Sequence, residues 1–227
     1  MKLAFALLAV TATLAAALGL DVLHWLTKPT ATLVLLGMVW PRPGAYARAV
    51  ALGLAASAAG DAFLMLPQDL FLPGLACFFV AHLAYIRAFS HDTRLLPDAW
   101  AALGAGVLGV AIIAALWPGL PAGMGLPVVA YAGVLALMAA QAVGRARRNP
   151  VPGAGLAAAG AMLFLISDTV LALDRFAAPL TVFAGLFPPG DQPGLAALLA
   201  QPVVLTTYYA AQACIAGSAL VRGGRAR

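Results

Sequence analysis

The stretch AWAALGAGVLGVAIIAALW, residues 99–117, contains no charged residue and no interruption of its apolar character. A helix needs about 20 such residues to cross the hydrocarbon core of a bilayer, so this stretch predicts a transmembrane helix. Its letters 104–109, GAGVLG, match the GxGxxG pattern of dinucleotide-binding loops, but no strand precedes them. Inside a membrane span, small residues at this spacing instead predict a face for helix packing.

The rest of the chain has the same apolar character. Of its 227 residues, 63% are hydrophobic and 9% are charged, with a mean hydropathy of +0.97. Soluble domains are about 45–50% apolar and about 25% charged. A water-soluble fold of this size could not bury so much apolar surface. The composition therefore predicts an all-α integral membrane protein whose single domain covers residues 1–227.

Proline, glycine and charged residues divide the chain into eight apolar runs, which predict a bundle of about eight transmembrane helices. The runs are Leu3–Leu20, Trp25–Trp40, Tyr46–Leu66, Leu70–Phe89, Ala99–Trp117, Met124–Val143, Pro152–Leu173 and Gln201–Val221. The first run also resembles a secretory signal peptide, but it is longer than the usual apolar region of about 7–15 residues. We expect it to be retained, and cleavage stays open as the alternative. The Pro- and Gly-rich stretch Asp174–Ala200 predicts a long loop with room for a short interfacial helix.

The basic residues are distributed unevenly among the connections. If the N-terminus is cytoplasmic, all but two of the 13 lysines and arginines lie on the cytoplasmic side, and only Lys28 and Arg175 lie outside. This excess predicts that both termini are cytoplasmic. It also explains the net charge of +5 without a nucleic-acid partner, since no basic stripe carries interleaved aromatic residues. The high Ala, Gly and Arg content points to a GC-rich bacterial genome, and hence to the plasma membrane.

Two of the aspartates lie where lipid disfavours charge. Asp61 and Asp168 are each five residues inside the outer end of their predicted spans, about 7–8 Å deep at 1.5 Å per residue. A carboxylate at bilayer depth costs of the order of 2.5–3.5 kcal/mol, so such a residue usually faces the bundle interior and has a function. A structural polar contact is the alternative. The remaining aspartates are expected to be solvated in loops or at span ends, apart from Asp174, which we expect to pair with Arg175: Asp21, Asp69, Asp92, Asp98 and Asp191.

Other polar side chains occur at similar positions. Lys28 is expected to open the second span, followed by Pro29 in the first turn, where proline is tolerated. His82 is placed near the middle of the fourth span, with Tyr85 one turn deeper. Each of these, like the polar residues of the last span, has an ordinary structural explanation. Together they predict a polar cavity that opens outward, with these last-span members: Tyr208, Tyr209 and Gln212.

Familiar catalytic motifs are absent from the sequence. No GxSxG surrounds a serine, and of the three histidines only His82 lies well inside a span, so a His₃ zinc site is excluded. Cys77 and Cys214 form no CxxC motif. A carboxylate-rich metal site stays open, and no cofactor is predicted.

Several strings, in order and spacing, resemble the lysoplasmalogenase-like YhhN family of multipass membrane proteins. They are Lys28-Pro29, GDAFLM (60–65), FFVAHLAY (78–85), ISDTVLA (166–172) and YYAAQ (208–212). The resemblance implies an eight-helix protein that cleaves the vinyl ether bond of lysoplasmalogens to a fatty aldehyde and glycerophospho-choline or -ethanolamine. It also implies Asp61 and Asp168 as the central catalytic pair, with substrate-binding residues around them: Lys28, His82, Tyr208 and Gln212.

This chemistry suits two carboxyl groups. Hydrolysis of a vinyl ether begins with protonation of carbon, and water then captures the resulting oxocarbenium ion. The reaction therefore needs an acid and a carboxylate but no nucleophilic side chain, as in glycosidases. Two alternatives stay open: a small transporter, and a metal-dependent lipid hydrolase that uses Asp61, Asp168 and His82 as ligands. The partners predicted are a lysophospholipid substrate and membrane lipids.

Overall fold

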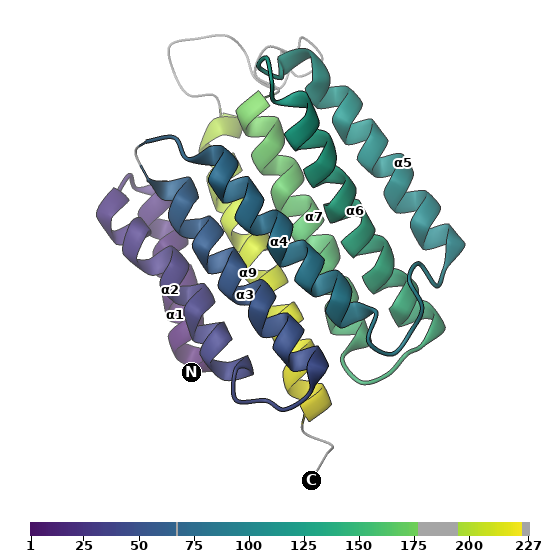
Figure 1. Cartoon of the computed structure of the whole chain (residues 1–227). Helices are drawn as coiled ribbons and strands as arrows, with labels where there is room; N and C mark the ends of the chain where they lie inside the picture. The colour runs from purple at the N-terminus through teal and green to yellow at the C-terminus, as the bar shows by residue number, and fades with distance from the viewer. Residues whose placement is uncertain (67, 177–194, 224–227) are drawn as a thin grey trace.

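The chain folds into a bundle of long helices (Figure 1). The computed structural model describes residues 1–66, 68–176 and 195–223, with the side chains of 195–199 and 223 excepted. In those residues there are eight α-helices, one short 3₁₀ turn after α5, and no strand. The helices are α1 (Lys2–Ala17), α2 (Asp21–Val39), α3 (Ala45–Met65), α4 (Phe71–Phe89), α5 (Ala99–Leu116), α6 (Gly125–Arg148), α7 (Ala154–Phe176) and α9 (Leu195–Gly223).

Seven of these helices are long and apolar enough to cross a membrane, with mean hydropathies between 1.3 and 2.2. The eighth, α1, is apolar but has only 16 residues. The chain is therefore a multi-pass membrane protein, and the predicted all-α bundle is confirmed. The predicted cytoplasmic position of both termini remains a prediction.

The position of each helix in the bundle decides which helices can form a site. Helix α9 runs through the middle and packs against α1, α2, α3 and α7, while α5 lies at one edge and packs mainly against α6 (Figure 1). Close approach between helices depends on glycine. A Cβ at Gly160 of α7 would lie 2.8 Å from the carbonyl oxygen of Ala211 on α9. Small residues thus allow the backbones to pack closely, as is usual in membranes.

The GxGxxG stretch lies on α5, as predicted, but most of it is not a packing face. A Cβ at Gly104 or Gly106 would meet nothing within 4 Å, whereas one at Gly109 would lie 3.4 Å from Ala136 of α6. The interpretation as a helix-packing face is therefore wrong for the first two glycines. The reason is the edge position of α5, which has a neighbour on one side only.

Several helix ends differ from the predicted spans, and three of these differences concern Lys28 or the predicted loop. Helix α2 begins at Asp21, so Lys28 and Pro29 lie inside it and not in its first turn. An acidic residue in the first turn complements the helix dipole, and membrane helices tolerate internal proline. Helix α7 continues to Phe176, and α9 already begins at Leu195. Both ends of the predicted loop are therefore helical, and its middle, with the possible interfacial helix, falls on residues 177–194, outside the described residues.

Candidate functional site

A cavity lies in the half of the bundle that holds the C-terminal ends of α3, α5 and α7. Its void is about 930 Å³, part of it open to the surface. Both intramembrane aspartates, Asp61 of α3 and Asp168 of α7, line it, together with Lys28 of α2 and Tyr208 of α9.

Asp61 is fully buried, and its polar partners come from two other helices. Its Oδ2 accepts hydrogen bonds from the hydroxyls of Tyr208, at 2.6 Å, and Thr32, at 3.0 Å. The ammonium of Lys28 lies 3.5 Å from Oδ1, which has no hydrogen-bond partner among the described residues. Buried charges persist when they are paired in this way. One carboxylate oxygen is nevertheless left without a hydrogen bond at the cavity.

Two further hydrogen bonds, through Gln212 and Tyr85, hold the Tyr208 hydroxyl in place. The amide nitrogen of Gln212, one turn along α9, donates to the Tyr208 hydroxyl at 3.1 Å. The amide oxygen of Gln212 accepts from Tyr85 of α4 at 2.7 Å. The tyrosine ring is therefore held in one orientation, with its own proton directed at Asp61.

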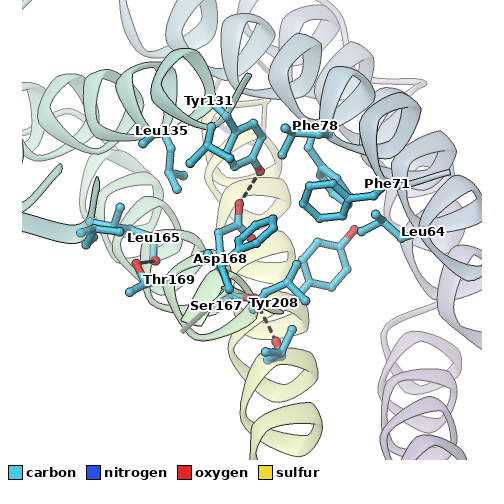
Figure 2. Close-up of a pocket in the computed structure, with 18 of the residues that line it drawn as sticks. Leu64, Phe71, Phe78, Tyr131, Leu135, Leu165, Ser167, Asp168, Thr169 and Tyr208 are labelled. Carbon is cyan, nitrogen blue, oxygen red and sulfur yellow. Dashed lines mark hydrogen bonds between the residues drawn. The ribbon is translucent and has the colours of Figure 1, made fainter. Parts of the chain in front are cut away.

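Asp168 has a separate set of partners. The hydroxyl of Tyr131 on α6 donates to Asp168 Oδ2, and the same hydroxyl lies 3.0 Å from Nε2 of His82. His82 Nε2 is also 3.6 Å from that carboxylate oxygen. Because Tyr131 gives its proton to Asp168, the donor order that satisfies all three groups has His82 donating to Tyr131. Figure 2 shows Asp168 between Tyr131 and Tyr208.

Most of the remaining cavity wall is apolar, and the hydroxyls of Ser167 and Thr169, which also line it, donate to backbone carbonyls. Phe71 and Phe78 of α4 face Asp168 across the cavity, and Leu135 and Leu165 lie on the side of α6 and α7 (Figure 2). Phe164 of α7 packs edge-on against His82 at 4.8 Å and against Tyr208 at 5.5 Å between ring centroids. The polar groups around the two aspartates are therefore joined by aromatic packing.

The structure brings most of the sequence-predicted residues together. Lys28 and Tyr208 contact Asp61, His82 lies beside Asp168, and Gln212 acts one contact further out. Tyr209 does not line the cavity, and its buried hydroxyl has no hydrogen-bond partner in the part of the chain that the structure describes.

The sequence pattern did not predict two residues that donate hydrogen bonds to the aspartates. Tyr131 carries a hydroxyl in a predicted span whose only other polar side chain is Gln141. Thr32 lies one turn after Lys28 on the same helix face. Searching each predicted span for every polar side chain, and not only for charges, would have found both.

The metal-dependent alternative named Asp61, Asp168 and His82 as ligands. In the described residues, no three His, Cys, Asp or Glu side chains lie close enough together to hold one ion. Asp61 instead has a lysine and two hydroxyls around it. This donor set suits a carboxylate in an ion pair and not a carboxylate on a metal.

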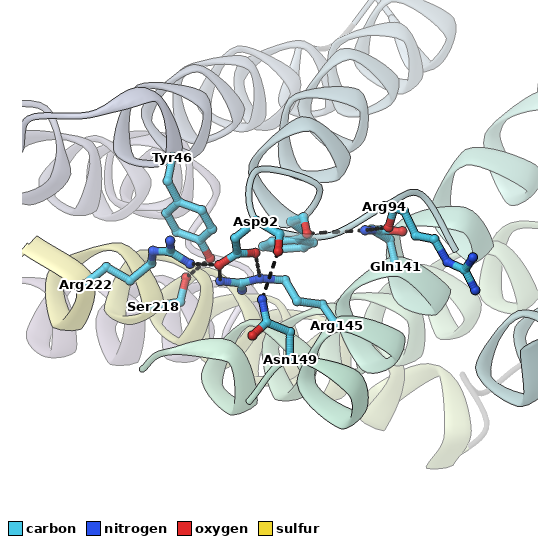
Figure 3. Close-up of polar contacts among 9 residues, drawn as sticks. Tyr46, Asp92, Arg94, Gln141, Arg145, Asn149, Ser218 and Arg222 are labelled. Atoms are coloured by element: carbon cyan, nitrogen blue, oxygen red, sulfur yellow. Dashed lines mark hydrogen bonds and ion pairs between the residues drawn. The ribbon is translucent and has the colours of Figure 1, made fainter. Parts of the chain in front are cut away.

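At the opposite end of the bundle, Asp92 was expected to be solvated, and that expectation is wrong. Arg145 donates to both of its oxygens, at 2.7 and 3.0 Å, and Arg222 donates to Oδ2 at 2.5 Å (Figure 3). Both guanidiniums stack on the ring of Tyr46. Partial burial would raise the pKa of Asp92, but the hydrogen bonds from the two arginines outweigh it and lower that pKa to about 2.

Two further expectations about aspartates are also wrong. Asp98 is buried, caps α5 by accepting from the amide of Ala101, and accepts from Arg148 at 2.8 Å. Arg175 pairs with Asp69 at 2.8 Å and not with its neighbour Asp174. Adjacent residues on a helix point in different directions, so they do not face each other.

The chain matches the model of the YhhN family over residues 23–219. It belongs to that family. The matched range includes every residue that lines the cavity, from Lys28 to Tyr208. The cavity of this YhhN protein therefore lies within the part of the chain that matches the family.

Two named relatives match this YhhN protein over most of its length, and a third matches less than half of it. It is 35% identical over 214 residues to lysoplasmalogenase TMEM86B of Homo sapiens, which covers 88% of this chain and 78% of the human protein. It is 32% identical over 202 residues to lysoplasmalogenase TMEM86A of Bos taurus, covering 86% of this chain and 68% of the bovine protein. A bacterial protein, the membrane protein YhhN of Escherichia coli O157:H7, is 33% identical over 96 residues, covering 41% and 46% of the two chains. No solved structure matches the chain.

Proposed function

We propose that this protein is an integral-membrane lysoplasmalogenase of a bacterial plasma membrane. It would hydrolyse the vinyl ether bond of a lysophospholipid to a fatty aldehyde and a glycerophospho-alcohol. The observation that carries the proposal is the cavity, which combines two carboxyl groups and a lysine with long apolar walls. The names of the human and bovine relatives support the same reaction.

The contacts of the two carboxyl groups suit different roles. Asp61 has an ammonium group at 3.5 Å and two hydroxyl donors, which are contacts that stabilise an ionised carboxylate. Asp168 receives one hydroxyl, from Tyr131, and Nε2 of His82 lies 3.6 Å from it, but among the described residues no lysine or arginine is paired with it. We therefore assign Asp168 as the acid and Asp61 as the carboxylate that activates water.

In the first half of the reaction, Asp168 gives up one proton and Asp61 takes up one. The carboxyl proton of Asp168 passes to the second carbon of the alkenyl chain, and the π electrons of the double bond form the new C–H bond. This leaves an oxocarbenium ion at the first carbon. Water attacks that carbon and gives a proton to Asp61, which produces a hemiacetal.

Collapse of the hemiacetal restores both groups. Its hydroxyl proton returns to Asp168 as the carbonyl forms, the bond between the first carbon and the glycerol oxygen breaks, and Asp61 gives its proton to that oxygen. The products are an aldehyde and an alcohol. Water is the only co-reactant consumed.

The test is turnover by the purified protein in detergent. Lysoplasmalogen should release fatty aldehyde, whereas the alkyl-ether analogue should bind without turnover, because it has no double bond to protonate. Transport of intact lysolipid into liposomes without aldehyde release would refute the proposal in favour of a transporter. Loss of turnover in EDTA that a divalent ion restores would refute it in favour of the metal-dependent hydrolase.

Asparagine substitutions test the carboxyl groups. A positioned acid or base contributes about 10²–10⁴-fold, so Asp61→Asn and Asp168→Asn should each lower kcat by that order, with KM less affected. The double variant should be little worse than the weaker single variant, because the two groups act in one reaction. Only Asp168→Asn should regain activity as the concentration of a small buffer acid rises. Substantial turnover by both single variants would refute the pair.

A further inference from the structure

The cavity has a polar side and an apolar side, and the helix packing separates them. Lys28 and Asp61 come from α2 and α3, which pack against each other and against α9. Tyr131 and Asp168 come from α6 and α7. Helix α5 packs against α6 and α7 at the far edge of the bundle (Figure 1). The order across the cavity is therefore Lys28, Asp61, Asp168 and then the wall formed by α5.

The α5 wall is entirely apolar. Gly109, Ile112 and Leu116 line the cavity at a spacing of three and four residues, which puts them on one face of the helix. Val110 lies on the other face and is 68% exposed. The only polar atom in the side chains of α5 is the indole nitrogen of Trp100, which does not line the cavity. The far side of the cavity can therefore offer hydrophobic contact but no hydrogen bond from α5.

A lysolipid has the same order of groups: a phosphate head, the reacting ether bond, and one unbranched hydrocarbon chain. We propose, resting on the proposed function, that this cavity holds such a lipid in a single orientation. The phosphate lies at Lys28, the ether bond lies between the two aspartates, and the hydrocarbon chain runs along α5. In this orientation Ile112 limits the length of the chain that the cavity accepts.

The orientation agrees with the assignment of the acid. In a vinyl ether, the carbon that takes the proton is the second carbon of the chain, so it lies on the α5 side of the ether oxygen. Asp168, from α7 next to α5, is on that side, and Asp61 is on the side of Lys28. The same arrangement leaves the glycerol oxygen nearer to Asp61, which returns its proton.

The experiment compares alkyl-ether lysolipids that differ by two carbons in chain length, measured as binding to the purified protein and therefore independent of turnover. Each buried CH₂ contributes about 0.8 kcal/mol, which is about a fourfold change in Kd. Ile112→Trp should shift the preferred chain by at least one two-carbon step towards shorter lipids. For the longest lipid, the Kd of this variant should rise about 15-fold relative to wild type, the product of two fourfold steps.

Two further variants keep the result interpretable. Val110→Trp places the same ring on the lipid-facing side of α5 and should leave the chain preference unchanged. Ile112→Ala, which cannot overfill the site, should shift the preference towards longer chains. An unchanged preference in both Ile112 variants, or an equal shift in Val110→Trp, would overturn the proposal.

The head of the lipid is tested separately. Lys28→Gln should weaken discrimination between lysolipids with and without a phosphate group, with chain preference unchanged. Retained discrimination would overturn the proposed orientation. If graded chain binding depends on Ile112 but no vinyl ether is cleaved, the proposed function fails and the binding site stands. If cleavage occurs with a chain preference that Ile112 does not affect, the function stands and the binding site fails.

Discussion

Two adjacent tyrosines on α9 allow a sharp test of the hydrogen bonds around Asp61. The hydroxyl of Tyr208 donates to Asp61 at 2.6 Å and accepts from Gln212 at 3.1 Å. The hydroxyl of Tyr209 is also buried, but it has no partner within the described ranges. Replacing either tyrosine by phenylalanine removes one oxygen and keeps the ring. The two variants therefore differ only in whether the lost hydroxyl had contacts.

The expected loss follows from the charge of Asp61. A hydrogen bond to a charged group contributes about 1.5–3 kcal/mol, which corresponds to about a 10- to 150-fold change in rate. Tyr208→Phe should lower kcat/KM for lysoplasmalogen by that factor. Tyr209→Phe should stay within about twofold, since removing a hydroxyl without a partner costs no hydrogen bond.

The assay is aldehyde release, with thermal unfolding in detergent measured beside it. Tyr208→Phe should remain folded, because its ring still packs against Phe164 and Phe78. An equal loss of activity in both variants would mean that the loss does not depend on the hydrogen bonds of the Tyr208 hydroxyl. Unchanged activity in Tyr208→Phe would refute the role given to that hydroxyl.

Two further predictions concern the opposite end of the bundle. The pKa of Asp92 is lowered from 3.8 to about 2, so its stabilisation is complete above about pH 4 and is lost as the pH falls towards 2. The gap in Tm between wild type and Asp92→Asn should therefore shrink over that interval, and a gap that stays constant would contradict the ion pairs with Arg145 and Arg222. The basic residues predict a cytoplasmic C-terminus. A reporter that is active only outside the cytoplasm should be silent when fused after Arg227, and activity there would mean that a span is miscounted.

The sequence predicts the bundle well because lipid imposes a strong pattern. Seven predicted spans coincide with helices long enough to cross a membrane, and the remaining one, the first, coincides with the shorter helix α1. The ends are less predictable. Pro29 looks like the start of a helix, yet α2 begins at Asp21, because a membrane helix can continue through proline when neighbours compensate for the lost hydrogen bond.

The site is harder to predict from the sequence than the fold, because its contacts join residues that are far apart in the chain. Asp61, being charged within an apolar run, is conspicuous in the sequence. Its partner Tyr208 is 147 residues away, and only the central position of α9 brings the two together. Asp92 looks like an ordinary loop residue, since its partners Arg145 and Arg222 are 53 and 130 residues away. Such contacts cannot be inferred from local pattern.

The two ends of the bundle show how one residue type can serve two purposes. Asp92 has hydrogen bonds to both oxygens from two arginines, so it has little capacity left for a substrate. Oδ1 of Asp61 has no hydrogen bond among the described residues. Nδ1 of His82, beside Asp168, also has no hydrogen-bond partner there. Leaving a buried polar atom unsatisfied costs about 1–3 kcal/mol, and proteins tolerate such costs mainly where function requires them. Nη1 of Arg145, at the end that holds Asp92, also lacks a hydrogen-bond partner among the described residues, so unsatisfied atoms alone do not distinguish the two ends. The difference between the two aspartates is access, because Asp61 lines the cavity whereas both oxygens of Asp92 accept from arginines. This difference supports the proposed site at the cavity and a structural role for Asp92 in holding the helices together.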